Sequence, residues 1–190
     1  MKYDLKSTSP SKQRLPEYSQ SDEWIIKFLQ DAEVGHIATR WDDQPFITPS
    51  TFWYDVANHA IYFHSNIAGR VRANAERQTQ VCFETMRSGR RLPSNVALEF
   101  SFQYASVIAF GKIRVIEDEA EKESALYGLI QKYFPDMSAG KEYRPITDKE
   151  LKRTSVYAIG IETWSGKENW KDRADQSDEW DPLPAELLLS

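Results

Sequence analysis

One stretch of the chain, Phe100 to Ile116, limits the possible folds more than any other. It is rich in β-branched and aromatic residues, and it is longer than an ordinary strand. The alternation of apolar and polar residues becomes irregular around Gly111, which is typical of a point where a strand bends. We therefore expect a curved strand that is shared by two parts of a barrel.

Three segments have the pattern of helices. Ser21 can cap a helix that opens with two acids and carries one apolar stripe: Trp24, Ile25, Phe28 and Leu29. Glu117 to Phe134 also opens with acids, has apolar residues at helical spacing and is stopped by Pro135. A shorter helix is predicted over Ala68 to Arg77.

The remaining apolar segments are short and β-rich. They are Val34–Arg40, Phe46–Tyr54, Ala60–Ser65, Thr79–Met86 and Ser155–Ile161. Arg87 to Pro93 contains Gly, Pro and three arginines, so we interpret it as a basic loop. Many short strands joined by turns predict a closed or nearly closed antiparallel barrel with helices outside it.

The length and composition favour one domain. A chain of 190 residues that is 41% hydrophobic can bury a core without disulfides. We assign that domain to residues 21–170. Residues 1–20 lack periodicity and are predicted to be a flexible arm that either wanders or lies on another subunit. Residues 171–190 form an acidic tail, whose tip at Leu187 to Leu189 either docks or frays.

Charge and targeting signals exclude several classes of function. The formal net charge of -5 disfavours binding to nucleic acid. No run approaches the roughly 18 apolar residues of a membrane helix, and no apolar region follows the amino terminus. Cys82 is the single cysteine and cannot form an internal disulfide, so we expect a cytoplasmic protein without membrane attachment. The aromatic content of 13% suits a flat ligand or a large interface.

The junction from His64 to Arg72 joins a predicted strand to a predicted helix. Arg70 and Arg72 lie in the first helical turn, where cations oppose the helix dipole. Free backbone N–H groups, the Ser65 hydroxyl, Gly69 and two guanidinium groups would together suit a phosphate. The alternative is that both arginines point into water. His64 could bind the same ligand, or it could be structural.

Other candidate residues give weaker signals. His36 and His59 have no cysteine or carboxylate cluster at metal spacing, so no metal site is expected. Cys82 lies in an apolar pattern and is interpreted as an inert thiol. The nucleophile elbow, the Walker loop and the Rossmann glycine pattern are all missing. Trp164-Ser165-Gly166-Lys167 follows the last predicted strand and could cover a planar ligand or form an ordinary turn.

Three blocks of sequence together resemble one known family. The first runs from Gly35-His36-Ile37-Ala38-Thr39 through Ile61-Tyr62-Phe63-His64-Ser65 to Gly69-Arg70, the second is Tyr104 to Lys112 followed by Val115-Ile116-Glu117-Asp118, and the third is Trp164 to Lys167. In order and spacing they are similar to the pyridoxamine 5'-phosphate oxidase-related, FMN-binding split-barrel family. The branch that they resemble contains the nitroimidazole-resistance proteins. The resemblance covers roughly residues 20–170.

The resemblance implies a mainly β fold with flanking helices, a six-stranded antiparallel split barrel. It implies a homodimer with one FMN in each of two clefts at the subunit interface. The phosphate would contact His64, Ser65, Gly69 and Arg70, and the ring would lie along Pro49, Ser50, Thr51 and Phe52. Tyr104, Ser106, Trp164 and Lys167 would approach the flavin, some of them from the partner chain.

The sequence departs from the family pattern at two places. Val71 stands where the family often has Lys, so Arg72 would supply the second cation. The carboxyl end turns acidic where true pyridoxamine phosphate oxidases have an Arg-rich segment, so oxidation of vitamin B6 is disfavoured.

The resemblance leads us to expect an oxidoreductase that passes electrons from a reduced nicotinamide to a small nitroaromatic or quinone-like electrophile, with His64 or Tyr104 as proton donor. Deazaflavin F420 or haem in the cleft is an alternative. So is a non-catalytic flavin sensor whose loop at Arg87, Arg90 and Arg91 contacts a partner protein. A barrel without a cofactor is the fourth possibility.

Overall fold

The structure is a computed structural model that describes residue 4 and residues 6–188. Most of the predicted arm and tail lies within this range, but residues 1–3 and 5 of the arm and Leu189 of the tail tip lie outside it. The helices are η1 (Pro16–Tyr18), α1 (Asp22–Asp31), α2 (Arg70–Arg77), α3 (Glu119–Tyr133), α4 (Asp148–Arg153) and η2 (Ala185–Leu188). The strands are β1 (Ser19–Gln20), β2 (Val34–Trp41), β3 (Gln44–Thr51), β4 (Trp53–Asp55), β5 (Ala60–Asn66), β6 (Gln80–Leu92), β7 (Ser101–Val115) and β8 (Thr154–Asn169).

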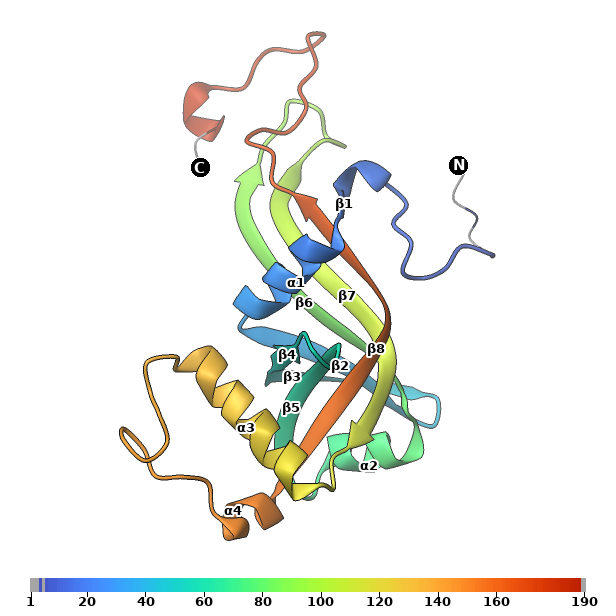
Figure 1. Cartoon of the computed structure of the whole chain (residues 1–190). Coiled ribbons are helices and arrows are strands. Elements are labelled where there is room, and N and C mark those ends of the chain that lie inside the picture. Colours follow the sequence, from blue (N-terminus) through green and yellow to red (C-terminus); the bar gives the residue numbers. More distant parts are fainter. Residues whose placement is uncertain (1–3, 5, 189–190) are drawn as a thin grey trace.

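One antiparallel sheet wraps into the barrel (Figure 1). Its strand order is β3-β2-β6-β7-β8-β5-β4, with β1 paired to β8. The two ends of this order, β3 and β4, are separated in sequence by Phe52 alone. The chain over residues 44–55 therefore pairs first with β2 and then with β5, and it joins the two edges of the sheet.

The predicted fold class is confirmed, with eight strands in place of six. The two extra strands have simple origins. The predicted strand Phe46–Tyr54 is broken at Phe52 into β3 and β4, and the two-residue β1 comes from the amino-terminal arm. When β3 and β4 are taken as one bent strand and β1 is set aside, six strands remain.

The long strand predicted over 100–116 is β7, and its bend lies where the sequence places it. The pairing of β7 with β8 shifts register between Phe110 and Gly111. A Cβ at Gly111 would lie 2.0 Å from the carbonyl oxygen of Gly160, so only glycine allows the two strands to approach this closely. Beyond the barrel, the upper ends of β6, β7 and β8 continue as an extension (Figure 1).

Two predictions of strand length are wrong. Arg87 to Leu92 continues β6 and does not form a loop, because a bulge between Ser88 and Arg91 absorbs the breaker residues. The side-chain oxygen of Gln103 accepts a hydrogen bond from the Arg90 N–H at 3.1 Å and holds this bulge. Likewise, Trp164 to Lys167 lies inside β8, because these residues pair with β7.

The predicted helices are confirmed within a few residues. The Ser21 side chain accepts a hydrogen bond from Trp24 N–H and caps α1, which buries Ile25, Phe28 and Leu29. Asp118 caps α3 in the same way. Helix α1 packs against β4, β7 and β8. Figure 1 shows α3 covering β5 at the other end of the barrel.

The core fills the barrel interior with aromatic and branched side chains. Phe52 and Phe83 are fully buried and make an edge-to-face contact at 4.8 Å between ring centroids. A smaller apolar cluster lies between the sheet and α3: Ala60, Tyr62, Ile116, Ala125, Val156 and Ala158. Burial of these groups is the main favourable term in the folding of the chain.

Both terminal segments pack on the same chain. Ser19 and Gln20 pair with Lys167 and Gly166 of β8, so this part of the arm is a strand of its own sheet. The tail folds onto residues 93–96, where the Asn95 side chain accepts a hydrogen bond from Ser177 N–H and donates one to the Ser177 carbonyl oxygen. Among the described residues, no helix has the length and apolar character needed to cross a membrane.

Candidate functional site

The start of α2 lacks the features that usually stabilise a helix start. Gly69 is the N-cap and offers no side-chain hydrogen bond, and the first turn contains no acid. Gly69 has φ 153, and a Cβ placed there would meet nothing within 4 Å. The first N–H groups of α2 therefore have no capping side chain from Gly69, and uncapped N–H groups of this kind are what an anion site uses.

The structure separates His64 from Ser65, because adjacent residues of a strand face opposite sides of a sheet. The Ser65 hydroxyl lies on the barrel side, 3.0 Å from the Tyr157 hydroxyl. His64 lies on the side of Tyr62 and lines a cavity beneath α3. Of the two side chains, only that of Ser65 faces the start of α2.

The two arginines of α2 differ in their contacts. The Arg70 guanidinium lies 4.5 Å from the centroid of the Phe46 ring, on β3. Arg72 donates to Glu76 at 2.5 Å, to Glu117 at 3.2 Å and to the Ser155 hydroxyl at 3.3 Å. These contacts raise the pKa of Arg72, the hydrogen bond with Glu76 being the main cause. Arg70 is therefore the better placed of the two to bind a phosphate.

Strand β3, where we predict the flavin ring to lie, is at one end of the strand order and pairs only with β2. Half of its backbone groups therefore face away from the sheet. Pro49, Ser50 and Thr51 belong to this edge. Phe52 does not: its side chain is fully buried, and its N–H and carbonyl oxygen both lie 3.0 Å from the Tyr133 hydroxyl.

Tyr104, Ser106 and Lys167 form one group on the outer face of β7 and β8. Ser106 is the register partner of Lys167, and the Lys167 ammonium lies 5.0 Å from the centroid of the Tyr104 ring. The arm adds Tyr18, whose ring lies 5.9 Å from the same ammonium. A cation held between two aromatic rings suits contact with a flat, electron-rich ligand.

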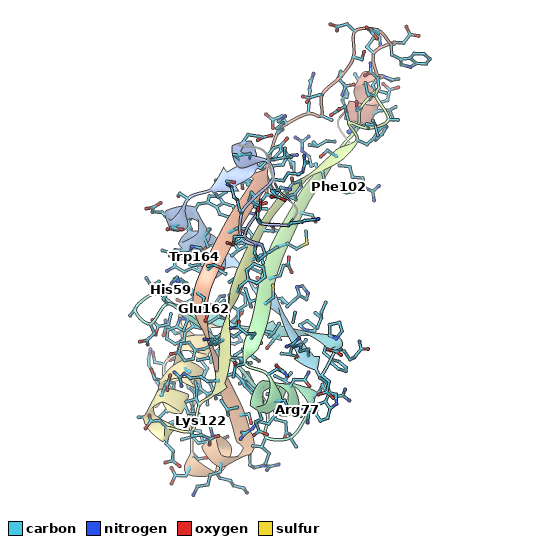
Figure 2. The ribbon with its side chains drawn as sticks, turned by 90° about the vertical axis from the view of Figure 1, so that its right-hand side faces the viewer. His59, Arg77, Phe102, Lys122, Glu162 and Trp164 are labelled. Carbon is cyan, nitrogen blue, oxygen red and sulfur yellow. The ribbon has the colours of Figure 1, made fainter. Side chains whose placement is uncertain are left out.

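Trp164 does not join this group. Its ring packs against His59 at 4.6 Å, and its indole N–H donates to Asp22 at 2.8 Å, so it faces α1. Figure 2 shows Trp164 beside His59, well away from Phe102 at the far end of β7. The four residues expected to approach a flavin thus lie on two faces of the sheet.

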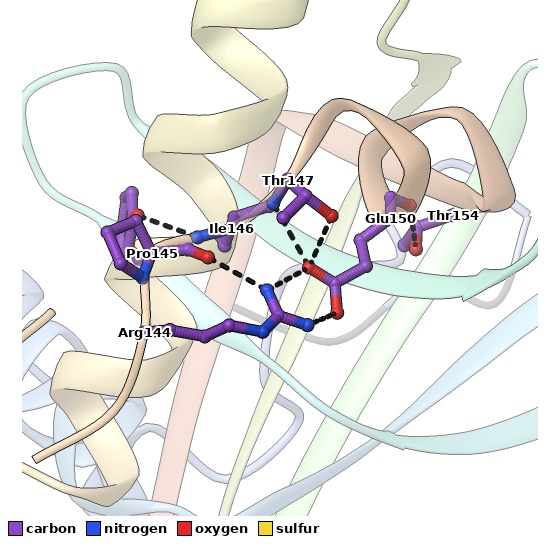
Figure 3. A network of polar contacts seen from close by, with 7 residues as sticks. Arg144, Pro145, Ile146, Thr147, Glu150 and Thr154 are labelled. Atoms are coloured by element: carbon purple, nitrogen blue, oxygen red, sulfur yellow. Dashed lines mark hydrogen bonds and ion pairs between the residues drawn. The ribbon is translucent and has the colours of Figure 1, made fainter. Parts of the chain in front are cut away.

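The cavity beside His64 has a volume of about 500 Å³. Leu126, Leu129 and Ile130 of α3 form its apolar wall. Figure 3 shows its rim, where Arg144 donates two hydrogen bonds to Glu150 at 2.9 and 2.7 Å. These bonds, with the capping contacts from Thr147, lower the pKa of Glu150 to about 2. Burial lowers the pKa of His64, which favours the neutral form of its imidazole.

A second cavity contains residues that the sequence patterns missed as a site. It has a volume of about 440 Å³ and lies between the end of α1 and the adjacent parts of β2 and β6. His36 lines it, and His36 Nδ1 lies 2.9 Å from a carboxylate oxygen of Glu84. Because the two residues are 48 positions apart in sequence, only the pairing of β2 with β6 brings them together.

The surroundings of Cys82 agree with our interpretation of this residue as an inert thiol. The residue is partly buried, and burial together with the nearby Glu84 raises its pKa. A raised pKa keeps the sulfur protonated and weakly nucleophilic at neutral pH.

Comparisons with known proteins agree on the fold. The family model of pyridoxamine 5'-phosphate oxidase matches residues 21–168. No curated protein matches the chain. Among solved structures, the flavocytochrome Anf3 from Azotobacter vinelandii is 23% identical with a TM-score of 0.77, covering 91% of this chain and 85% of that chain.

Two further structures are similar. The FAD and heme binding protein from Mycobacterium smegmatis is 23% identical with a TM-score of 0.75, covering 84% of this chain and 76% of that chain. A structure described as that of a 5-nitroimidazole antibiotic resistance protein from Bacteroides thetaiotaomicron is 21% identical with a TM-score of 0.65, covering 79% and 90%. At these identities the likeness is one of fold.

Proposed function

Because this chain belongs to the pyridoxamine 5'-phosphate oxidase family, we propose that it binds a flavin, FMN, at the start of α2 and works as an oxidoreductase. The observation that carries the proposal is the uncapped start of α2, which has Arg70 beside it and free space around Gly69. The names of the flavocytochrome and of the FAD and heme binding protein support a flavin in a barrel of this shape.

The residues of this chain fit an FMN phosphate. The first N–H groups of α2, the Ser65 hydroxyl and the Arg70 guanidinium supply donors of the kind that bind phosphate. The free edge of β3, at Pro49 to Thr51, supplies backbone groups for the polar edge of a flavin ring. His64 faces away from this site, so we propose Tyr104 as the proton donor.

We also propose that a second copy of the chain completes the site. Ser65 pairs with Ser155 on β8, whereas Ser106 pairs with Lys167 on the same strand. Ser155 and Lys167 are separated by about 40 Å of strand, at roughly 3.3 Å per residue. One flavin cannot span this length, so Tyr104, Ser106 and Lys167 would reach the phosphate cradle from the partner of a homodimer.

When bound, the flavin supplies hydride and single-electron transfer, while the protein supplies position and access. Tyr104 and Lys167 would hold the substrate side of the cleft, with a phenol proton within reach. The proposed donor is a reduced nicotinamide, and the proposed acceptor is a small nitroaromatic or quinone-like molecule. The tail folds onto residues 93–96. Arg173 is the only arginine in the sequence of residues 171–190, which supports our view that pyridoxamine phosphate is not the substrate.

Replacing Arg70 tests the phosphate assignment. Loss of its charge-assisted hydrogen bonds removes about 1.5–3 kcal/mol, so Arg70→Ala is expected to weaken FMN binding roughly 10- to 100-fold. The measurement is fluorescence titration with FMN, repeated with FAD. The control is Arg77→Ala at the other end of α2, where Arg77 pairs with Asp42 and lies over Trp41.

Equal FMN affinity in Arg70→Ala and wild-type protein would reject the phosphate site. A full FMN load without turnover, for any nicotinamide donor and nitro or quinone acceptor, would instead favour the non-catalytic sensor. An absorption spectrum of the purified protein separates the cofactors, because flavin, F420 and haem absorb differently.

A haem is the second candidate ligand, in addition to the flavin. Two structural neighbours carry a cytochrome or a heme in their names. The specific observation that favours it here is the cavity of about 440 Å³ that His36 lines, with Glu84 bonded to its Nδ1.

A further inference from the structure

The cavity beside His64 is a feature that flavin binding leaves unexplained. Its volume of about 500 Å³ is typical of pockets for small organic ligands. Half of its lining residues are apolar: Leu126, Leu129, Ile130, Pro145 and Ile146. We infer that this cavity binds a compact, uncharged and largely apolar molecule whose single hydroxyl group contacts His64 and Tyr143.

Two polar side chains of this cavity, those of His64 and Tyr143, make no hydrogen bond within residues 4 and 6–188. The Thr154 hydroxyl, by contrast, donates to the Glu150 carbonyl oxygen at 2.9 Å. Burial lowers the pKa of His64, and the neutral imidazole that this favours has one donor and one acceptor nitrogen. The Tyr143 phenol also donates and accepts. A ligand hydroxyl suits both partners, because it too can donate and accept.

The charged groups at the rim of the cavity exclude a charged ligand. Arg144 donates to the two carboxylate oxygens of Glu150 at 2.9 and 2.7 Å, and to the Pro145 carbonyl oxygen at 3.0 Å (Figure 3). Glu150 also accepts from the Thr147 N–H at 3.0 Å and from its hydroxyl at 2.9 Å. A ligand anion would have to compete with Glu150 for Arg144, and a ligand cation would have to compete with Arg144 for Glu150. An uncharged ligand leaves this pair intact.

The cavity is separate from the proposed flavin site. His64 and Ser65 are adjacent on β5 and face opposite sides of it, and Ser65 lies on the side of the phosphate cradle. A ligand beside His64 therefore leaves the start of α2 free. It would contact β5, α3 and α4 at once, so its binding is expected to raise the unfolding temperature.

Calorimetric titration of the full chain with 4-tert-butylcyclohexanol tests the inference. This alcohol is uncharged, and it is not flat, so it cannot stack on a flavin ring. We expect saturation at one molecule per chain, with the same affinity in FMN-saturated and FMN-free protein. The matched probe is 4-tert-butylcyclohexanecarboxylate, which is expected to bind at least about 10-fold more weakly because a carboxylate loses more hydration on entering the cavity.

Three variants test the residues that form the site. His64→Ala and Tyr143→Phe each remove one hydrogen bond to the ligand, so each is expected to weaken binding of the alcohol about 3- to 10-fold. Ile130→Trp fills the cavity from α3 and is expected to abolish binding. His36→Ala, which removes the histidine of the other cavity, is the matched control and is expected to bind the alcohol as wild type does.

Four outcomes would overturn the inference: no saturable binding of the alcohol, equal affinity for the carboxylate, unchanged affinity in both His64→Ala and Tyr143→Phe, or displacement of the alcohol by FMN. Urea unfolding of Ile130→Trp shows whether that variant is folded, and the two polar variants carry the test if it is not. Failure of the flavin proposal is distinguishable, because Arg70→Ala is expected to lose FMN affinity and to bind the alcohol as wild type does.

Discussion

At the scale of single residues, Lys132 is a titrating group that burial in the fold perturbs strongly. Its ammonium lies 3.6 Å from the centroid of the Phe52 ring and donates to the Leu29 carbonyl oxygen at 3.1 Å. Burial lowers its pKa from 10.5 to about 8, although Asp31 and Glu33 act in the opposite direction. The folded chain therefore releases this proton at a lower pH than the unfolded chain does.

This shift predicts a pH dependence of stability. Between about pH 8 and 10.5 the unfolded state binds more protons at Lys132, so the free energy of unfolding rises with pH in that window. Lys132→Met removes this titrating ammonium, so the variant lacks the gain in stability that wild type makes as the pH rises. The free energy of unfolding of the variant, relative to that of wild type, is therefore expected to fall between pH 7.5 and pH 10. Urea unfolding at both pH values measures this difference, and a constant difference would contradict the prediction.

Residue types at the phosphate site could be predicted from the sequence, but side-chain directions could not. Ser65 and His64 are both part of the predicted cradle, yet they face opposite sides of β5 because a strand alternates at every residue. Arg72 has the charge that a phosphate needs, but Glu117, 45 residues away, pairs with it. The pairing of His36 with Glu84 could not be predicted from the sequence, because Glu84 lies 48 residues away on another strand.

At the scale of elements, the strands β6 and β8 are longer than their local sequences suggest. Gly89 and the arginines around it have the composition of a loop, but a bulge and the Gln103 amide keep them in the sheet. Position 166 is also a glycine, and a Cβ there would come within 2.7 Å of Ile25 in α1. Tertiary contacts therefore decide both strand lengths.

The break between β3 and β4 depends on α3. The Tyr133 hydroxyl accepts a hydrogen bond from the Phe52 N–H at 3.0 Å and lies 2.6 Å from the Glu33 carbonyl oxygen. Tyr133→Phe leaves these backbone groups without their partner, so it is expected to lower the free energy of unfolding by about 1–3 kcal/mol. Chemical denaturation measures the free energy of unfolding of this variant and of a control, Tyr143→Phe. The Tyr143 hydroxyl that the control removes has no hydrogen bond within the described residues. Equal stability of the two variants would contradict this role for Tyr133.

At the scale of the whole molecule, barrel closure follows from patterns that are visible in the sequence. The long bent strand, the capped helices and the three family blocks predict a split barrel. The packing of the arm on β8 and of the tail on residues 93–96 could not be predicted, because both segments lack periodicity. Their order comes from backbone pairing and from single side chains such as Asn95.

A mixed dimer tests whether each site is built from two chains. Arg70→Ala chains lack the phosphate cradle, and Tyr104→Ala/Lys167→Ala chains lack the opposite wall. If the walls come from different chains, a dimer with one chain of each kind has one intact site, whereas neither homodimer has any. Two affinity tags isolate the mixed dimer for FMN titration. Binding no tighter than in the homodimers would contradict a shared site.

The most direct test of the central claim compares FMN with riboflavin, which lacks the phosphate, on wild-type and Arg70→Ala protein. If the phosphate lies at the start of α2, wild-type protein binds FMN roughly 10- to 100-fold more tightly than riboflavin, and Arg70→Ala loses most of that preference. Riboflavin affinity is expected to be the same in both proteins. An FMN preference that survives the loss of Arg70 would place the phosphate elsewhere and contradict the account.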